Sequence, residues 1–291
     1  WSSDVCSSDL FAGRYWLRLE LRALDRALAS TGKARRVAVA DALLFRAKRY
    51  AVSKPGVAEA EALLEANEGL AEYTGVTLGA QTLGAAPAAY ARRDLASVEK
   101  RSSLVRSFAY GTGPAYGVLL DEARASWRPR AIRGGRLDVL LRRAYRLGTP
   151  HPADADRRAA LYGSTVVKAE EDKREAERQT RLRTFQARLV DGPTVWVPLE
   201  GSGGGFDPNQ VYPFGPFGVV YGYYSASGPW GDLESTEMTL IPSEGGFAIL
   251  AGPARRDGDR LTGQGWTLKL KAGWTLQARA KGGEELDRKS T

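Results

Sequence analysis

The chain has 291 residues, of which 43% are hydrophobic and 26% are charged, as in ordinary globular proteins. No apolar run approaches the ~20 residues that a membrane-spanning helix needs, so no such span is expected. The formal net charge is +8. The arginines alternate with acids along amphipathic patterns, and no nucleic-acid-binding motif accompanies them, so we expect no nucleic-acid partner.

Both ends of the chain match translated sequencing adapter. Residues 1–10 (WSSDVCSSDL) match such an adapter, and residues 287–291 (DRKST) match its start on the opposite strand. Segments of this kind are excluded before the fold is considered. The natural segment is therefore expected to run from Phe11 to about Leu286. It contains no cysteine, because the single Cys6 lies in the adapter match.

The first part of the natural segment has the apolar spacing of amphipathic helices. Arg46, Lys48 and Arg49 fall near the end of the second of these helices, where basic side chains suit the helix dipole. We expect helices over about 11–30, 34–50, 55–75, 92–107, 118–125, 137–147 and 153–189.

The helix expected over 55–75 carries two opposed stripes. The acidic stripe falls within ~60° on a helical projection and consists of Glu61, Glu65, Glu68 and Glu72. Stacked like charges cost a few tenths of a kcal/mol per pair, so a cationic group or water should face them. The opposite stripe is apolar, is expected to be buried, and consists of Leu63, Ala66, Leu70 and Tyr73.

Glu20 lies among apolar residues of the first helix, with Arg18 and Arg22 near it. One interpretation makes it an alternative metal ligand, or an acid that supports one. The other interpretation, which we favour, is an ion pair on the flank of a helix, because such pairs are routine there.

A glycine-rich stretch follows residue 105. Gly111, Gly113 and Pro114 are expected to break any regular element. The resulting turn would carry Arg106, Tyr110 and Tyr116, whose polar ends could face a cleft. The alternative, slightly preferred, is that both tyrosines pack in the core with their hydroxyls bonded to the backbone.

The character of the chain changes at residues 191–193, where glycine, proline and aromatic residues begin to dominate. Alternating or β-branched runs, separated by turn clusters, predict strands over 194–199, 218–225, 233–241, 247–251 and 266–270. The expected fold class is α+β. A helical subdomain over 11–190 precedes a small antiparallel sheet domain over 191–286, built as a sandwich or a barrel.

The segment Asn67-Glu68-Gly69-Leu70-Ala71 resembles the Asn-Glu-Gly-Phe-Ala element of gluzincin zinc peptidases, the clan of thermolysin-like enzymes and aminopeptidases. The resemblance covers about a dozen residues. It implies that Glu68 is the third zinc ligand and that Glu72 hydrogen-bonds a ligand histidine. It also implies an oxyanion-stabilising donor elsewhere in the chain, for which Tyr110, Tyr116 and Arg106 are the candidates.

The family's first two zinc ligands come from a His-Glu-x-x-His helix, and this chain has none. Its one histidine, His151, lies between two prolines and is expected in a loop. The resemblance therefore implies an inactive piece of a zinc-dependent peptidase, with zinc and a peptide or protein substrate belonging to the complete parent. No cofactor is expected in the piece itself.

The alternative from a different class is a non-catalytic binding or scaffold protein, in which a helical domain and a β module expose a solvated acidic face. The sequence leaves the oligomeric state open. An extracytoplasmic location, secreted or periplasmic, is slightly favoured.

Overall fold

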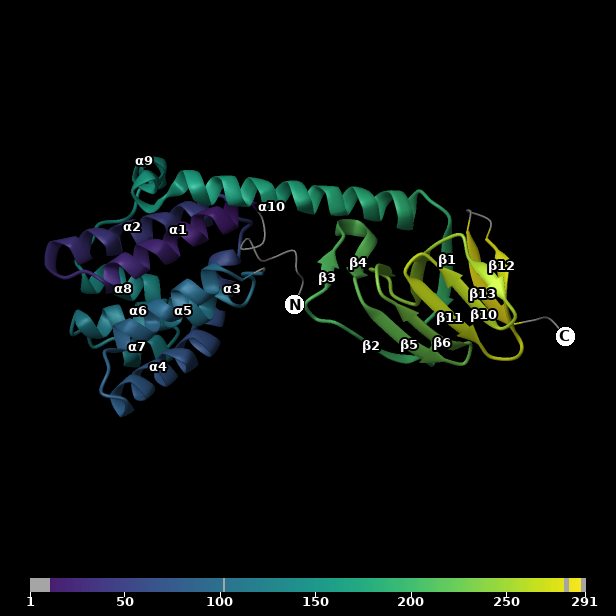
Figure 1. Ribbon diagram of the computed structural model, residues 1–291. Helices are drawn as coiled ribbons and strands as arrows, with labels where there is room; N and C mark the ends of the chain where they lie inside the picture. Colours follow the sequence, from purple (N-terminus) through teal and green to yellow (C-terminus); the bar gives the residue numbers. More distant parts are fainter. Residues whose placement is uncertain (1–10, 102, 280–282, 289–291) are drawn as a thin grey trace. The chain divides into compact units, whose positions relative to one another are not determined.

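The computed structural model describes residues 11–101, 103–279 and 283–288. The helices of the first part are α1 (Phe11–Leu28), α2 (Gly32–Ala51), α3 (Val57–Leu64), α4 (Leu70–Thr82), α5 (Pro87–Glu99), α6 (Phe108–Glu122), α7 (Arg128–Ile132), α8 (Leu137–Ala144), α9 (Ala155–Ala159) and α10 (Ser164–Phe185) (Figure 1). A π-helical turn, η3 (Glu65–Gly69), joins α3 to α4 without a break. Within these described residues, every helix is too short or too polar to cross a bilayer.

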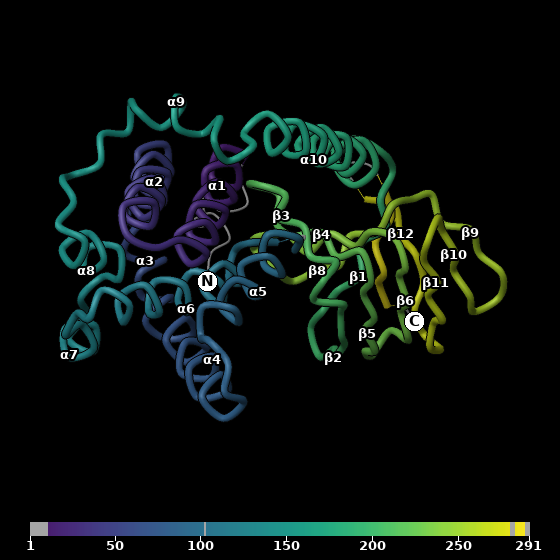
Figure 2. The backbone as a smooth tube through the Cα atoms, turned by 60° about the vertical axis from the view of Figure 1, so that its left-hand side comes forward, coloured from purple at the N-terminus to yellow at the C-terminus, as the bar shows by residue number. Residues whose placement is uncertain are grey.

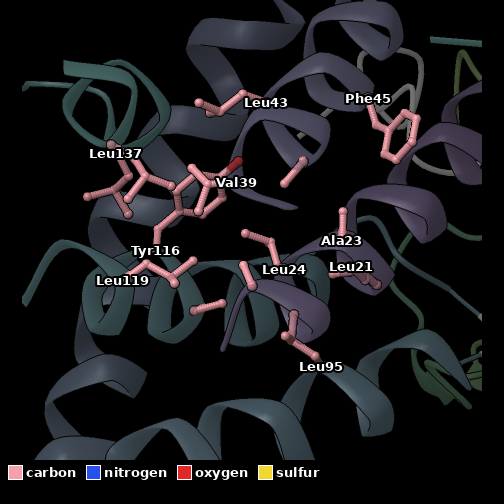
Figure 3. Packing of buried hydrophobic residues seen from close by; sticks show 14 of the residues in the cluster. Leu21, Ala23, Leu24, Val39, Leu43, Phe45, Leu95, Tyr116, Leu119 and Leu137 are labelled. Atoms are coloured by element: carbon pink, nitrogen blue, oxygen red, sulfur yellow. The ribbon is translucent and has the colours of Figure 1, made fainter. Parts of the chain in front are cut away.

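The helical unit is built around the pair α1 and α2, which lie side by side (Figure 2). Leu17, Leu24 and Ala27 of α1 are fully buried, as are Val39 and Phe45 of α2. Helices α5, α6 and α8 complete the core, into which Leu95, Leu119 and Leu137 project (Figure 3). Burial of such side chains supplies the main stabilisation, at roughly 1.5–3 kcal/mol for each large apolar residue.

Two departures from the sequence prediction concern glycine. The helix predicted to end near Gly75 continues to Thr82, because Val76 and Ala80 are buried and hold its last turns. The predicted break at Gly111, Gly113 and Pro114 is wrong, since α6 runs through all three. Here glycine serves close packing between helices rather than a turn.

The close packing joins η3 and α4 to α6. A Cβ atom placed on Gly69 would lie 2.9 Å from the carbonyl oxygen of Ala109 and 3.0 Å from Cα of Gly113. A Cβ on Gly113 would overlap the backbone of Gly69, and one on Gly117 would overlap the ring of Tyr73. The backbones therefore meet directly, and this contact fixes where the residues around Gly69 lie.

The N-terminal half of α10 is attached to α1 by buried ion pairs. Arg14 Nε donates to Glu171 Oε2 at 2.9 Å, and Arg18 Nη1 donates to Glu171 Oε1 at 3.0 Å. All three side chains are nearly inaccessible to solvent. The first half of this mostly charged helix thus belongs to the helical unit.

The second unit is built from strands, as the sequence predicts. They are β1 (Thr194–Pro198), β2 (Gly203–Phe206), β3 (Val211–Pro213), β4 (Gly218–Tyr221), β5 (Tyr224–Gly228), β6 (Gly231–Ser235), β7 (Thr239–Pro242), β8 (Phe247–Ala251), β9 (Arg255–Asp257), β10 (Arg260–Gly263), β11 (Trp266–Leu270), β12 (Trp274–Ala278) and β13 (Glu284–Arg288). The predicted α+β class is confirmed.

The strands form two sheets, neither of which closes into a barrel. One has the order β12-β13-β1-β8-β7-β4-β3 and the other β2-β5-β6-β11-β10-β9. Neighbouring strands are antiparallel except β1 and β13, which are parallel with Val195 opposite Glu284. Val195 and Leu250 of the first sheet share a core with Leu233 and Leu268 of the second, so the sheets pack face to face.

The end of α10 belongs to this second unit. The compact units divide between Glu175 and Ala176, inside α10. Phe185 and the following Leu189 pack with Val220 and Leu240 against the other face of the first sheet. The change from helix to strand falls at residues 191–193, as predicted, whereas the packing boundary lies earlier because these two apolar residues cover the sheet.

We predict that Gly113→Ala destabilises the helical unit by ~1–3 kcal/mol or more, because the added methyl group meets rigid backbone. The matched control is Gly75→Ala within α4, where a Cβ would meet no heavy atom within 4 Å. That substitution should stabilise by up to ~1 kcal/mol through helix propensity. Urea unfolding of both variants measures the difference, and equal effects would contradict the proposed backbone contact.

Candidate functional site

The Asn67-Glu68-Gly69 segment lies in the π turn η3, between α3 and α4. A π turn accommodates one residue more than an α turn, and such turns occur often at functional sites. The extra residue changes the rotational position of the residues that follow it. The four glutamates of the predicted acidic stripe therefore do not share one environment.

The predicted orientation is wrong for the first part of this helix. Leu63, expected to be buried, is 58% exposed, and Ala66 is also exposed, whereas Tyr73 of the same predicted stripe is buried. Glu61 and Glu65, expected to face a cationic group or water, are only 3% and 1% exposed. The acidic face is the inner one because two arginines of α2 lie opposite it, which satisfies the expectation that a cation faces the stripe.

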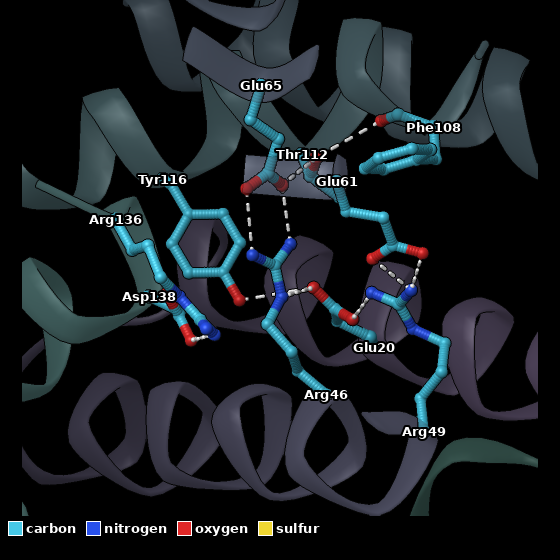
Figure 4. Close-up of polar contacts among 10 residues, drawn as sticks. All are labelled: Glu20, Arg46, Arg49, Glu61, Glu65, Phe108, Thr112, Tyr116, Arg136 and Asp138. Atoms are coloured by element: carbon cyan, nitrogen blue, oxygen red, sulfur yellow. Dashed lines mark hydrogen bonds and ion pairs between the residues drawn. The ribbon is translucent and has the colours of Figure 1, made fainter. Parts of the chain in front are cut away.

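Arg46 meets Glu65 through a two-point contact (Figure 4). Its Nη1 donates to Glu65 Oε2 at 2.8 Å and its Nη2 to Oε1 at 2.5 Å. The Thr112 hydroxyl of α6 donates to the same Oε1 at 2.5 Å. Bidentate pairs of this kind are the stronger class of charge-assisted hydrogen bond and fix the orientation of both groups.

Glu20 lies between the two arginines. Arg46 Nε donates to Glu20 Oε1 at 2.7 Å, and Arg49 Nη2 donates to Oε2 at 3.1 Å. Arg49 also pairs with Glu61, and the Tyr116 hydroxyl donates to Glu20 Oε1 at 3.1 Å. Glu20 is thus in ion pairs, but at the centre of the helical unit rather than on a helix flank.

The buried network joins three carboxylates (Glu20, Glu61, Glu65) to two guanidinium groups (Arg46, Arg49). Burial opposes the charged form of Arg46, but the nearby carboxylates of Glu20 and Glu65 raise its pKa well above the ordinary value. Burial also raises the pKa of Tyr116, which stays a neutral donor. Tyr116 is fully enclosed, so among the oxyanion candidates it is placed in the core.

Glu68 lies at the edge of the helical unit, with its side chain 18% exposed. Arg106 forms an ion pair with its Oε1, and the Tyr110 hydroxyl faces the same carboxylate. Hydrogen bonding from Tyr110, and next from Arg106, lowers the pKa of Glu68. Its Oε2 is buried and accepts no hydrogen bond of ordinary geometry from the described residues.

The structure therefore divides the candidate residues between two places. Arg106 and Tyr110 both meet Glu68: Arg106 lies in the turn just before α6, and Tyr110 lies in the first turn of the helix. Tyr116 lies further along α6 and points to Glu20 instead. Sequence reasoning missed that α6 is one continuous helix through Gly111, Gly113 and Pro114, which turns Tyr116 away from Tyr110.

A small pocket of about 110 Å³ lies beside Glu68. It is lined by Glu72 and Tyr110 together with Asp94, Ser97, Val98 and Arg101 of α5 and its C-terminal extension. Burial, and next the charge of Glu72, raises the pKa of Asp94. Sequence reasoning did not single out Asp94, because its place beside Glu72 depends on how α5 packs against α4.

Zinc does not fit the described residues alone. Among them, no three histidine, cysteine, aspartate or glutamate side chains are grouped so that they could hold a metal ion. Glu68 offers one free carboxylate oxygen, Glu20 has both oxygens occupied by arginines, and His151 is exposed on a distant connection. A tetrahedral catalytic site requires three protein ligands, so no reaction step can be derived through zinc here.

We predict that Arg49→Met destabilises the helical unit by ~3–5 kcal/mol, because it leaves Glu61 buried without its cation and Glu20 with Arg46 as its remaining one. The control is Arg92→Met, which removes an exposed ion pair with Asp25 and should cost no more than ~1 kcal/mol. Chemical denaturation of both variants measures the two losses. Similar small losses would show that the network contributes little.

We also predict that Tyr110→Phe raises the pKa of Glu68 towards its ordinary value, because the variant removes the strongest of the groups that lower it. A lowered pKa favours the ionised form. Its contribution to stability is present above the ordinary pKa and lost as pH falls through the lowered one. A carbon-13 NMR titration of the Glu68 carboxyl measures the shift. Tyr90→Phe should leave it unchanged, and an unaltered pKa in Tyr110→Phe would contradict the assignment.

The chain was compared with protein-family models, with curated proteins and with solved structures, and none of them matches it. The helical unit holds two groups of interacting polar residues, one around Glu20 and one around Glu68. Of these, only the Glu68 group is open to solvent.

Proposed function

We propose that the helical unit contributes one ligand, Glu68, to the metal site of a zinc-dependent peptidase-like protein. The other two ligands, both histidines, would come from a segment that this sequence does not contain. Zinc would supply an activated water for the hydrolysis of a peptide bond. The residues of this chain would position that site.

The observation that carries the proposal is the state of the Glu68 carboxylate. It carries the negative charge that a metal ligand needs, and hydrogen bonding from Tyr110 and then Arg106 lowers its pKa below the ordinary value. Its buried Oε2 accepts no hydrogen bond of ordinary geometry from the described residues. A metal ligand must be deprotonated and must have a free oxygen. The Gly69–Gly113 contact fixes the backbone next to Glu68, which gives the carboxylate the rigid placement that a metal site needs.

Arg106 and Tyr110 support the proposal as hydrogen-bond donors at the edge of the same site. Both contact the Glu68 carboxylate, and Arg106 is exposed on its outer side. Donors fixed near the point where charge develops stabilise an oxyanion. Glu72 lies in the adjoining pocket, where its carboxylate could accept a hydrogen bond from a ligand histidine.

The second candidate is a non-catalytic scaffold. It is favoured by the pairing of these acids with arginines: Glu61 with Arg49 and Glu65 with Arg46 in the core, and Glu68 with Arg106 at the edge. In this hypothesis Glu68 is one more structural ion pair. Its remaining oxygen would have no ligand to bind.

The test is a zinc titration of the full-length protein, obtained by extending the coding sequence in its source DNA. We expect micromolar or tighter binding together with peptidase activity. Glu68→Gln should weaken zinc binding by more than about 100-fold, beyond the range typical of residues that only support a ligand. Glu59→Gln, on the exposed first turn of α3, is the matched control.

Three results would count against the proposal. The extended sequence could lack a His-Glu-x-x-His helix, or Glu68→Gln could bind zinc as tightly as the parent. Stoichiometric, tight zinc binding by residues 11–286 alone would show that the ligand set is a different one. The first or second result would favour the scaffold hypothesis.

A further inference from the structure

The free edge at β2 differs from the other sheet edges of the second unit. All four residues of β2 (Gly203–Phe206) are exposed, and three of them are glycines with no side chain to shield the backbone. β2 is the outermost strand of its sheet and pairs only with β5. Its outward N–H and C=O groups form no hydrogen bond to other described residues.

The other three edges carry protection of the usual kinds. β9 consists of Arg255, Arg256 and Asp257, all charged. β3 ends in Pro213, and β12 is contacted by Arg256, whose Nη1 donates to Thr275 Oγ1 at 3.1 Å. An exposed edge without charge or proline is a template for the addition of another strand.

The charge around β2 is negative. The 66 residues from Leu189 to Ala254, which include β1 to β8, contain seven acidic residues and no lysine or arginine. On the outer face of this sheet, Gly203 and Gly205 pair with Ser227 and Ser225. These serines pair with Asp232 and Glu234 of β6.

Asp232 and Glu234 are exposed, and no ion pair of either is found among the described residues. Asp232 accepts a hydrogen bond from Ser227 Oγ at 2.7 Å and lies opposite Lys269 of β11, whereas Glu234 lies opposite the uncharged Thr267. Strand spacing of ~4.8 Å places β6 about 14 Å from a strand added outside β2. This exceeds the Debye length of ~10 Å at 0.1 M salt but is well within the ~30 Å at 0.01 M, so these acids attract a cationic strand at low salt. On the outer face, only the glycines of β2 and the serines of β5 lie between β6 and the added strand, so no large side chain obstructs it.

The far end of the edge adds an apolar contact. Phe206 is 51% exposed and packs against Tyr221, with ring centroids 4.9 Å apart. Tyr221 in turn contacts Tyr224 at 5.7 Å. A strand paired with β2 would place an apolar side chain against this group.

We infer that the β2 edge binds an extended, lysine- or arginine-bearing peptide segment of a partner protein by strand addition. Backbone hydrogen bonds to β2 provide the attachment, the acids of β6 select a cationic partner, and Phe206 receives an apolar side chain. This inference rests on residues separate from the Glu68 site and is independent of the proposed function.

The test measures binding of a fluorescent peptide with alternating lysine and valine to the 291-residue protein by fluorescence anisotropy at low salt. Two comparison peptides are used: one N-methylated at alternate residues, which removes backbone donors, and one with glutamate in place of lysine. Each should bind at least about tenfold more weakly than the parent peptide, because each lacks one of the two determinants.

The variant Gly203→Lys/Gly205→Lys blocks the edge. Neither glycine has a positive φ, and a Cβ would meet nothing within 4 Å at Gly203 and only Ser225 Oγ at 3.9 Å at Gly205. It should weaken binding at least about tenfold. The matched control, Gln264→Lys/Gln277→Lys, adds the same charge to the second unit at exposed positions outside β2, β5 and β6 and should change binding by less than about twofold.

The inference is overturned if the N-methylated peptide binds as well as its parent, or if no peptide binds at millimolar concentration. It is also overturned if the blocked variant, folded by circular dichroism, keeps its affinity. If that variant does not fold, the N-methylated peptide decides the question on the unaltered protein. Self-association of the protein that disappears in the blocked variant would assign the edge to a second copy instead.

Discussion

The helical unit depends on a set of charges that water does not reach. Arg46 and Arg49 of α2 are held by Glu20, Glu61 and Glu65, which come from α1, α3 and η3. Removing such ions from water costs several kcal/mol each, and only short, well-directed pairs offset that cost. An alternative register of these helices would leave at least one charge unpaired in the core. The network therefore specifies one arrangement of the helices, although its net contribution to stability can be small.

The succession of helices and then strands could be predicted from the sequence, because periodicity and turn residues are local signals. The orientation of the 55–75 helix could not. A prediction from amphipathic spacing assumes that the apolar face is buried. That assumption fails for Leu63, because Arg46 and Arg49 lie in the core opposite the glutamates. From the sequence, these arginines are explained only by their favourable position near the C-terminus of their own helix, because one sequence does not show which distant acids they contact. The helical state of α6 was missed for a related reason: the contact that favours Gly113 lies 44 positions away, at Gly69.

Because of this packing, Glu65 and Glu68 of the same π turn lie in different environments. Glu65 is fully engaged by Arg46 and Thr112 in the core, whereas Glu68 lies at the edge of the unit, and its buried Oε2 accepts no hydrogen bond of ordinary geometry from the described residues. The candidate motif could be found from the sequence, because Asn67-Glu68-Gly69 is contiguous. Its neighbours could be placed only in part: Arg106 and Tyr110 were named as candidates, but their pairing with Glu68 and the presence of Asp94 depend on helix packing.

The parallel pairing of β1 with β13 affects how the second unit folds during its synthesis. Thr194 opens the first strand and Glu284 opens the last, so one side of β1 stays an unpaired edge until some 90 further residues have emerged from the ribosome. At ~5–20 residues per second this takes roughly 5–20 s. During that interval Val195 and Val197 belong to an incomplete sheet that can pair with other nascent chains. Expression of the second unit should therefore respond to chaperones that shield strand edges more than expression of the helical unit does.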